Sequence, residues 1–248
     1  MAGDAPVTAG LATAAAAKPT VVSLGAGFMI SPEAKAAGKA GGYRGWELYM
    51  AGRAGVLGDA PATVVAAALG FFDPEMVRRN WEAGRAVRPV AEAVARYTEV
   101  CRDWGRNRWG AVDDLGRLCD LMARVVDAAD PSGLPVFAGW RAQPLPGDAP
   151  GRAAQLLHVL REHRGGAHLV AVRACGLTPL QAVVAGPYAE EAAFHGFAEP
   201  HPEPDDDLRA RRARAEDLTD CLAAPAYAVL DDAEAADLLR LLATLPTA

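Results

Sequence analysis

Hydrophobic positions recur at helical spacing over most of this chain. Residues 113–129 form one such stretch, an amphipathic helix with Leu115, Leu118, Cys119, Met122 and Val125 on a single face. Several segments place an N-capping side chain just before a proline of the first helical turn, which is typical of a helix start: residues 31–33, 59–61, 73–75, 148–150 and 178–179. The pattern therefore predicts a mainly α fold.

Strand-like alternation is short and scarce. It is confined to residues 20–24, 134–137 and the region of 197–200, which predicts a few short strands beside the helices. Pro89 interrupts the apolar pattern of residues 74–103, because proline removes a backbone donor and collides with the preceding turn. We expect two helices there, or one kinked helix.

Composition shifts divide the chain into an arm, two domains and a connection. Residues 1–19 are alanine-rich without a basic or long apolar stretch, so they are expected to be a disordered arm and not a signal peptide. Residues 20–130 then form an N-terminal helical domain, the proline-rich residues 131–150 a connection, and residues 151–248 a C-terminal winged-helix-like domain.

The C-terminal half has the pattern of a helix-turn-helix. We expect a helix at 152–164, a turn at Gly165-Gly166, a second helix at 168–174 and a third helix at 179–185, with a further helix at 188–195. The acidic, proline-rich residues 201–207 then occupy the place of a wing. Two more helices, 208–222 and 233–242, complete the chain.

A second segment resembles the centre of this motif. Residues 63–70 followed by Asp73-Pro74 have the pattern of residues 169–176 followed by Thr178-Pro179, with spacing that differs by one residue. Two helix-turn-helix-like units related by duplication would pack pseudo-symmetrically, whereas chance similarity in an alanine-rich chain is the alternative.

Three segments resemble an actinobacterial helix-turn-helix family labelled SalK-like: residues 160–168 (LREHRGGAH), 45–53 (GWELYMAGR) and 216–225 (EDLTDCLAAP). The resemblance covers nearly the whole chain and implies a helix-turn-helix architecture. It implies no particular reaction or set of catalytic residues, although an actinobacterial origin suggests a place in secondary metabolism.

Charge and composition argue against DNA as the main partner. The chain of 248 residues has a formal net charge of −6, and the third helix offers only Gln181 to read a base. The predicted wing is acidic and would repel phosphate. Arginines at 78, 79, 85, 88, 209, 211, 212 and 214 are the counter-evidence, unless acidic neighbours such as Glu82 pair with them.

The most concentrated ionisable residues are Glu162, His163, Arg164 and His168, which we take as candidate catalytic residues. Histidine is the natural acid or base near neutral pH, a glutamate can orient it, and an arginine can hold a carboxylate or an enolate-like oxygen. The alternative is that these residues form structural contacts at the end of a helix. His158, Glu162 and His168 do not have the spacing of a known zinc motif, so no metal is expected.

A second candidate site combines aromatic side chains with arginines, a combination that suits a planar or carboxylated ligand. The alternative for residues at these helical spacings is a plain hydrophobic core. The candidate ligand-binding residues are Tyr43, Trp46, Tyr49, Met50, Arg53, Trp140 and Arg141.

Together these features favour a cytoplasmic small-molecule-handling protein on a degenerate helix-turn-helix scaffold. It would be an acid–base biosynthetic enzyme of the cyclase, isomerase or lyase type without a cofactor, or a plain binder. The alternative is a ligand-responsive DNA-binding regulator. The four cysteines form no CxxC pair, no segment has the length and hydrophobicity of a membrane span, and a homodimer is left open.

Overall fold

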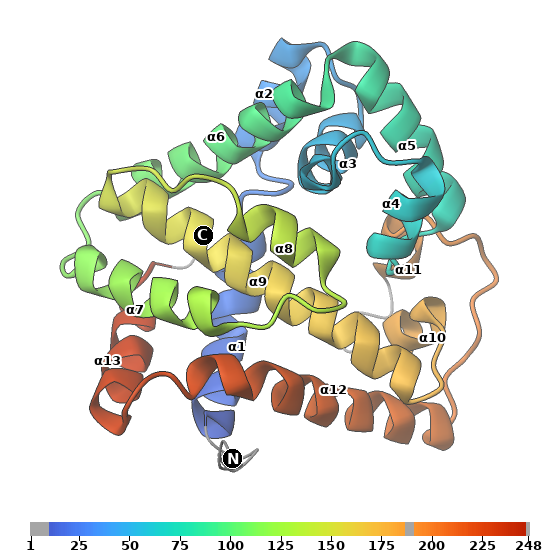
Figure 1. The fold of residues 1–248 in the computed structure, drawn as a ribbon. Helices are drawn as coiled ribbons and strands as arrows, with labels where there is room; N and C mark the ends of the chain where they lie inside the picture. Colours follow the sequence, from blue (N-terminus) through green and yellow to red (C-terminus); the bar gives the residue numbers. More distant parts are fainter. Residues whose placement is uncertain (1–9, 187–190, 247–248) are drawn as a thin grey trace.

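The computed structural model describes residues 10–186 and 191–246, and this part of the chain is helical without a strand (Figure 1). The elements are α1 (Leu11–Ala26), α2 (Pro32–Gly41), α3 (Glu47–Ala54), the 3-10 helix η1 (Gly55–Leu57), α4 (Ala62–Ala68), α5 (Pro74–Val87), α6 (Val90–Trp109), α7 (Leu115–Ala128), α8 (Pro135–Arg141), α9 (Ala149–Ala174), α10 (Pro179–Val184), α11 (Glu191–Phe194), α12 (Asp206–Tyr227) and α13 (Asp232–Leu242).

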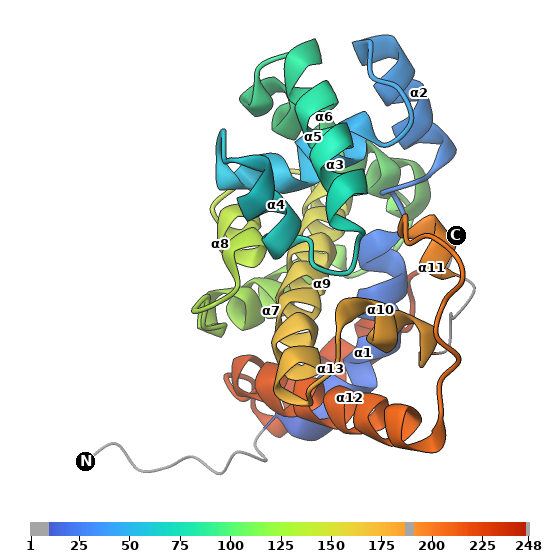
Figure 2. The same ribbon diagram turned by 90° about the vertical axis from the view of Figure 1, so that its right-hand side faces the viewer.

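The long helix α9 runs through the middle of the molecule, with the other helices around it (Figures 1 and 2). It packs against α1, α6, α7, α8 and α12. The main hydrophobic core joins residues from α1 to the C-terminal end, from Ala14 to Leu245, so packing does not divide the chain at the predicted connection 131–150. A smaller apolar cluster joins the end of α9 to α10 and α12.

Most of the predicted helix starts are confirmed. The side chains of Ser31, Asp73, Asp148 and Thr178 each accept a hydrogen bond from the backbone N–H three residues on, at 2.9–3.1 Å. Such a cap stabilises a helix by about 1 kcal/mol. The cap predicted at Asp59 is wrong, because Pro61 precedes α4 and the Asp59 carboxylate pairs with Arg85.

Two further helical predictions are confirmed. The stretch containing Pro89 forms two helices, α5 and α6, with Pro89 as the residue that precedes α6. Helix α7 buries the expected face, from Leu115 to Val125.

The predicted strands are wrong. Residues 20–24 belong to α1, residues 134–137 lie at the start of α8, and residues 197–200 form no strand. Residues 11–19 are also helical, so the predicted arm is wrong over that part, while residues 1–9 lie outside the described residues. One face of α1 is buried through Ala14, Ala17, Val21 and Leu24, which follow helical spacing. This packing outweighs the β-branched residues at 20–22, which favour a strand.

The helix-turn-helix corner differs from its predicted form. Helix α9 continues through Gly165-Gly166, so the predicted turn there is wrong. The chain turns instead at Gly176, whose φ of 71° suits glycine, and the Leu177 N–H closes the turn on the Val172 carbonyl oxygen at 3.0 Å. Helix α10 follows after a capping box between Thr178 and Gln181.

No wing of strands follows this corner in the described residues. Of the predicted helix 188–195, residues 188–190 lie outside the description, and α11 covers Glu191–Phe194. Residues 201–205 run without regular structure into α12. The two resembling segments both form a helix, a turn and a proline-started helix, but Gly176 has a positive φ and Gly70 does not. The duplication therefore stays a prediction.

Candidate functional site

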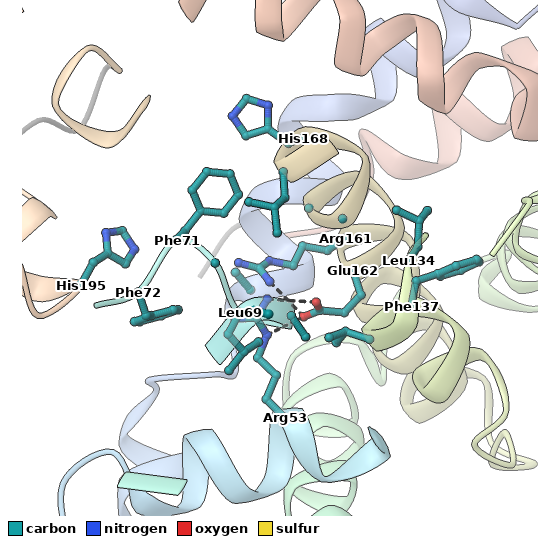
Figure 3. Close-up of a pocket in the computed structure, with 18 of the residues that line it drawn as sticks. Arg53, Leu69, Phe71, Phe72, Leu134, Phe137, Arg161, Glu162, His168 and His195 are labelled. Atoms are coloured by element: carbon teal, nitrogen blue, oxygen red, sulfur yellow. Dashed lines mark hydrogen bonds and ion pairs between the residues drawn. The ribbon is translucent and has the colours of Figure 1, made fainter. Parts of the chain in front are cut away.

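A cavity of about 610 Å³ lies beside the second half of α9, between the α4–α5 turn, α8 and α10 (Figure 3). We call it the α9 pocket. Its walls are mainly apolar and aromatic, with the most prominent side chains supplied by Leu69, Phe71, Phe72, Leu134, Phe137 and Leu169. This volume falls in the range of sites that enclose small organic molecules, about 300–1,000 Å³.

Helix α9 presents one continuous stripe to the pocket. Arg161, Glu162, Gly165, Gly166 and Leu169 all line it, at the spacing of neighbours on one helix face. A Cβ at Gly165 would meet nothing within 4 Å, and the nearest neighbour of a Cβ at Gly166 would be the Leu134 side chain, at 2.9 Å. Each glycine in a helix interior costs about 0.5–1 kcal/mol relative to alanine. The two glycines leave the space that the cavity occupies.

An ion cluster forms the polar end of the pocket. Glu162 accepts hydrogen bonds from Arg53 Nε at 2.8 Å and Nη2 at 2.9 Å, and from Arg161 Nη1 at 2.9 Å. Arg53 Nη1 also donates to the Tyr49 hydroxyl at 2.8 Å. Figure 3 shows both arginines reaching the same carboxylate. Two positive charges therefore meet one negative charge in a mostly apolar cavity.

The carboxylate of Glu162 stays ionised. Its side chain is only 2% exposed, and burial alone would raise its pKa, but the charges of Arg53 and Arg161 outweigh burial and hold the pKa well below its usual range. Burial would likewise lower the pKa of Arg53, and the adjacent Glu162 raises it instead. Glu162 therefore holds the arginines in place and is a weak base.

Buried groups under the cluster fix the position of Arg53. Trp140 is completely buried and its Nε1 donates to the Arg53 carbonyl oxygen at 3.0 Å. His158 Nδ1 donates to the Gly25 carbonyl oxygen at 3.3 Å, and burial lowers the pKa of His158 to about 4. This neutral histidine packs against Trp140, with ring centroids 4.4 Å apart, and so supports the site from the core.

His168 lines the pocket away from the ion cluster and stacks on Phe71, with ring centroids 5.4 Å apart. The Thr219 hydroxyl donates its proton to the Ala215 carbonyl oxygen at 2.6 Å, so at 2.8 Å it accepts from His168 Nδ1. The proton of the neutral ring is thus on Nδ1, and Nε2 carries the lone pair. Burial lowers the pKa of His168 to about 4, which keeps the ring neutral near pH 7.

The four candidate catalytic residues do not converge on one point. Only Glu162 and His168 line the pocket. His163 packs on Phe137 at 4.9 Å, and Arg164 is held by Glu216 at 2.9 Å and by Asp220 at 2.6 Å. Successive helical residues point about 100° apart, so a run of ionisable side chains on one helix spreads around it. The prediction of a joint catalytic set does not match this arrangement.

Of the candidate ligand-binding residues, Tyr49 and Arg53 line the pocket. The others support it or lie elsewhere: Tyr43 and Met50 are core residues, Trp140 bonds to the Arg53 backbone, Trp46 packs against Tyr49, Phe72 and Phe194, and Arg141 donates to the Ala129 carbonyl oxygen.

Sequence reasoning missed Arg161 and the wall formed by residues 69–72. Arg161 had a signal, because it lies four residues before Gly165 on the same face of a helix. The pocket wall had none, since its contact with α9 is a product of tertiary packing.

Most of the predicted DNA-reading side chains are engaged within the protein; Arg79 and Arg214 form no ion pair with the described residues. The side chain of Gln181 accepts from the Thr178 N–H at 2.9 Å, and Ala182 and Val183 of α10 face the pocket. Arg78 pairs with Glu75 and with Glu82, as expected for a helix face. Ion pairs also engage other arginines of the two clusters: Arg85 with Asp59, Arg88 with Glu92, Arg209 with Asp206, Arg211 with Asp207 and Arg212 with Glu216.

Within the described ranges, His, Cys, Asp and Glu side chains form no group of three that could hold a metal ion. Helices long and apolar enough to cross a membrane are likewise absent from residues 10–186 and 191–246.

Comparison with known proteins gives a single positive result. The model of a helix-turn-helix family matches residues 14–200, which run from the first turn of α1 past the end of α11. No curated protein matches the chain, and no solved structure matches it. The family match includes the α9–α10 corner and every pocket-lining residue except Arg212, and it spans most of the chain. The protein belongs to this helix-turn-helix family.

Proposed function

We propose that the protein binds a mainly apolar small molecule in the α9 pocket. The observation that carries this proposal is the cavity of about 610 Å³ with aromatic walls and one polar end. The mouth is apolar as well: Ile30, Val64, Val170 and Phe194 line the pocket and are each 42–49% exposed. An apolar rim lets an apolar molecule enter without crossing a charged surface.

The molecule we propose is one of actinobacterial secondary metabolism, a proposal supported by the resemblance of residues 45–53, 160–168 and 216–225 to the SalK-like group. If the protein is also an acid–base enzyme, His168 is the candidate base, since its neutral ring lines the pocket. Its Nε2 lies 3.9 Å from the Glu216 carboxylate, which favours the protonated ring. Glu162 is a weaker base still, because two arginines hold its pKa well below its usual range.

The proposal is tested with N-phenyl-1-naphthylamine, an uncharged aromatic probe that fluoresces in apolar surroundings. The wild-type protein is expected to bind one molecule per chain. Gly165→Leu fills the cavity and should abolish this binding, because a side chain at residue 165 points into open space. Gly116→Leu is the matched control, since Gly116 is a helical glycine with equally open space that does not line the pocket.

Retained binding in Gly165→Leu, or equal loss in both variants, would contradict the proposal. Circular dichroism of each variant confirms that the helices are intact.

A second function, a ligand-responsive DNA-binding regulator, is favoured by the family and by the position of α10. Ala182 and Val183 of this helix line the pocket, so a bound ligand touches the helix-turn-helix directly. Selective retention of one promoter from a genomic-fragment pulldown at moderate salt would support it, and uniform retention that disappears with salt would contradict it.

A further inference from the structure

The charged side chains that line the α9 pocket are mainly basic. Among the described side chains, Arg53, Arg161 and Arg212 line it with one carboxylate, that of Glu162, although the whole chain has a formal net charge of −6. His168 adds no charge near pH 7, because burial lowers its pKa to about 4. An acidic protein thus carries a positively charged cavity, a feature that attracts anions.

One of these arginines, Arg161, has N–H donors that no acceptor among the described residues engages. Arg53 and Glu162 form a two-point pair, and Arg161 shares the same carboxylate through Nη1 alone. A guanidinium has five N–H groups. The other N–H groups of Arg161, on Nε and Nη2, find no acceptor among residues 10–186 and 191–246.

Arg212 differs from Arg161 although it also lines the pocket. Its Nε donates to the Ala182 carbonyl oxygen at 3.0 Å, and its Nη1 donates to Glu216 at 2.9 Å. Arg212 is therefore anchored on both sides of its guanidinium. Arg161, which is 23% exposed, is the arginine with donors free to face a ligand.

We propose that the ligand of the α9 pocket is an organic anion, an aromatic or polycyclic carboxylate whose charged group binds Arg161. The inference rests on the proposed function, and it names the class of ligand. Arginine binds a carboxylate through two parallel N–H bonds, and the surrounding apolar walls strengthen such a contact. The Arg53–Glu162 pair positions Arg161, and the rings of the ligand lie against Leu69, Phe72, Leu134 and Phe137.

The test compares two probes that share an arylaminonaphthalene skeleton. 1-Anilinonaphthalene-8-sulfonate carries an anionic group, and N-phenyl-1-naphthylamine carries none. The wild-type protein should bind the sulfonate at least tenfold more tightly. Arg161→Met should weaken sulfonate binding by about tenfold to a hundredfold, as expected for a hydrogen-bonded charge, and change binding of the neutral probe by less than threefold.

Arg152→Met is the matched control. Arg152 lies on the same helix and pairs with Asp120 at 3.4 Å, but it does not line the pocket. This variant removes the same charge and should leave both affinities within threefold of wild type. A similar loss of sulfonate binding in both variants would show a general charge effect and overturn the inference.

The remaining outcomes are distinct. Binding of the neutral probe together with unchanged sulfonate affinity in Arg161→Met overturns the inference and leaves the proposed function standing. Equal weakening of both probes in Arg161→Met shows that Arg161 shapes the pocket without holding a charge, which also overturns it. Binding of neither probe by the wild-type protein contradicts the proposed function, and the inference with it.

Discussion

Removal of the Glu162 charge should be among the most damaging single changes in this protein. Glu162 is 2% exposed and accepts three N–H bonds, two from Arg53 and one from Arg161. Glu162→Gln leaves the guanidinium of Arg53 buried without a counter-charge, because its other hydrogen-bond partner is the neutral Tyr49 hydroxyl. Arg161 suffers less, since it is partly exposed.

The magnitude follows from the buried ion pair, since removal of one partner from such a pair costs about 3–5 kcal/mol. The amide oxygen of Gln can still accept the two bonds that Oε1 accepts, but the amide NH2 would oppose Arg53 Nη2, so that charge-assisted bond is lost. We therefore expect Glu162→Gln to lower the free energy of unfolding by about 3–5 kcal/mol.

Urea unfolding followed by circular dichroism measures this change, and a double-mutant cycle isolates the pair. Arg53→Met combined with Glu162→Met replaces both charges by apolar side chains, so the double variant should be more stable than the sum of the single losses predicts, by at least about 2 kcal/mol. A loss below 1 kcal/mol for Glu162→Gln, or additive losses in the cycle, would refute the view that this buried pair organises the polar end of the pocket.

Two further predictions concern stability. Burial lowers the pKa of His158, His163 and His168 to about 4 each. Between pH 6.5 and 4 the unfolded chain therefore binds more protons than the folded state, and the free energy of unfolding falls with the pH, by at most about 3 kcal/mol per histidine. His163→Leu should flatten this dependence in urea titrations, and an unchanged slope of the free energy of unfolding against pH would contradict it. Gly165→Ala should stabilise α9 by about 0.5–1 kcal/mol, because the added Cβ meets open space. Gly176→Ala should destabilise the protein by about 1 kcal/mol, because the φ of residue 176 is 71°. Melting temperatures that shift in the same direction for both variants would contradict this contrast.

The parts of the fold that depend on neighbours in sequence could be predicted. Ser31, Asp73, Asp148 and Thr178 cap their helices through atoms only three residues away, so the signal lies within a few positions of the chain. The turn at Gly165-Gly166 was predicted from the same kind of local signal and is wrong. Helices α1, α6, α7, α8 and α12 pack along α9, and that packing outweighs the low helix propensity of two glycines.

The candidate site was predictable only as separate residues. Arg53 and Glu162 could each be singled out for their charge, but they are 109 positions apart, and nothing in the sequence pairs them. His163 and Arg164 adjoin Glu162 in sequence, yet helical geometry turns them toward Phe137 and α12. Arg161, Gly165 and Leu169 follow one another at four-residue spacing along the stripe that lines the pocket, and Arg164 lies off that stripe.

The central claim is that the α9 pocket binds an organic anion through Arg161. A crystal structure of the protein with 1-anilinonaphthalene-8-sulfonate tests it most directly. We expect the fused rings to lie between Leu69 and Phe137 and the sulfonate to lie within hydrogen-bond distance of the Arg161 guanidinium. A probe bound only on the outer surface, or one inside the pocket with its sulfonate turned away from Arg161, would contradict the claim.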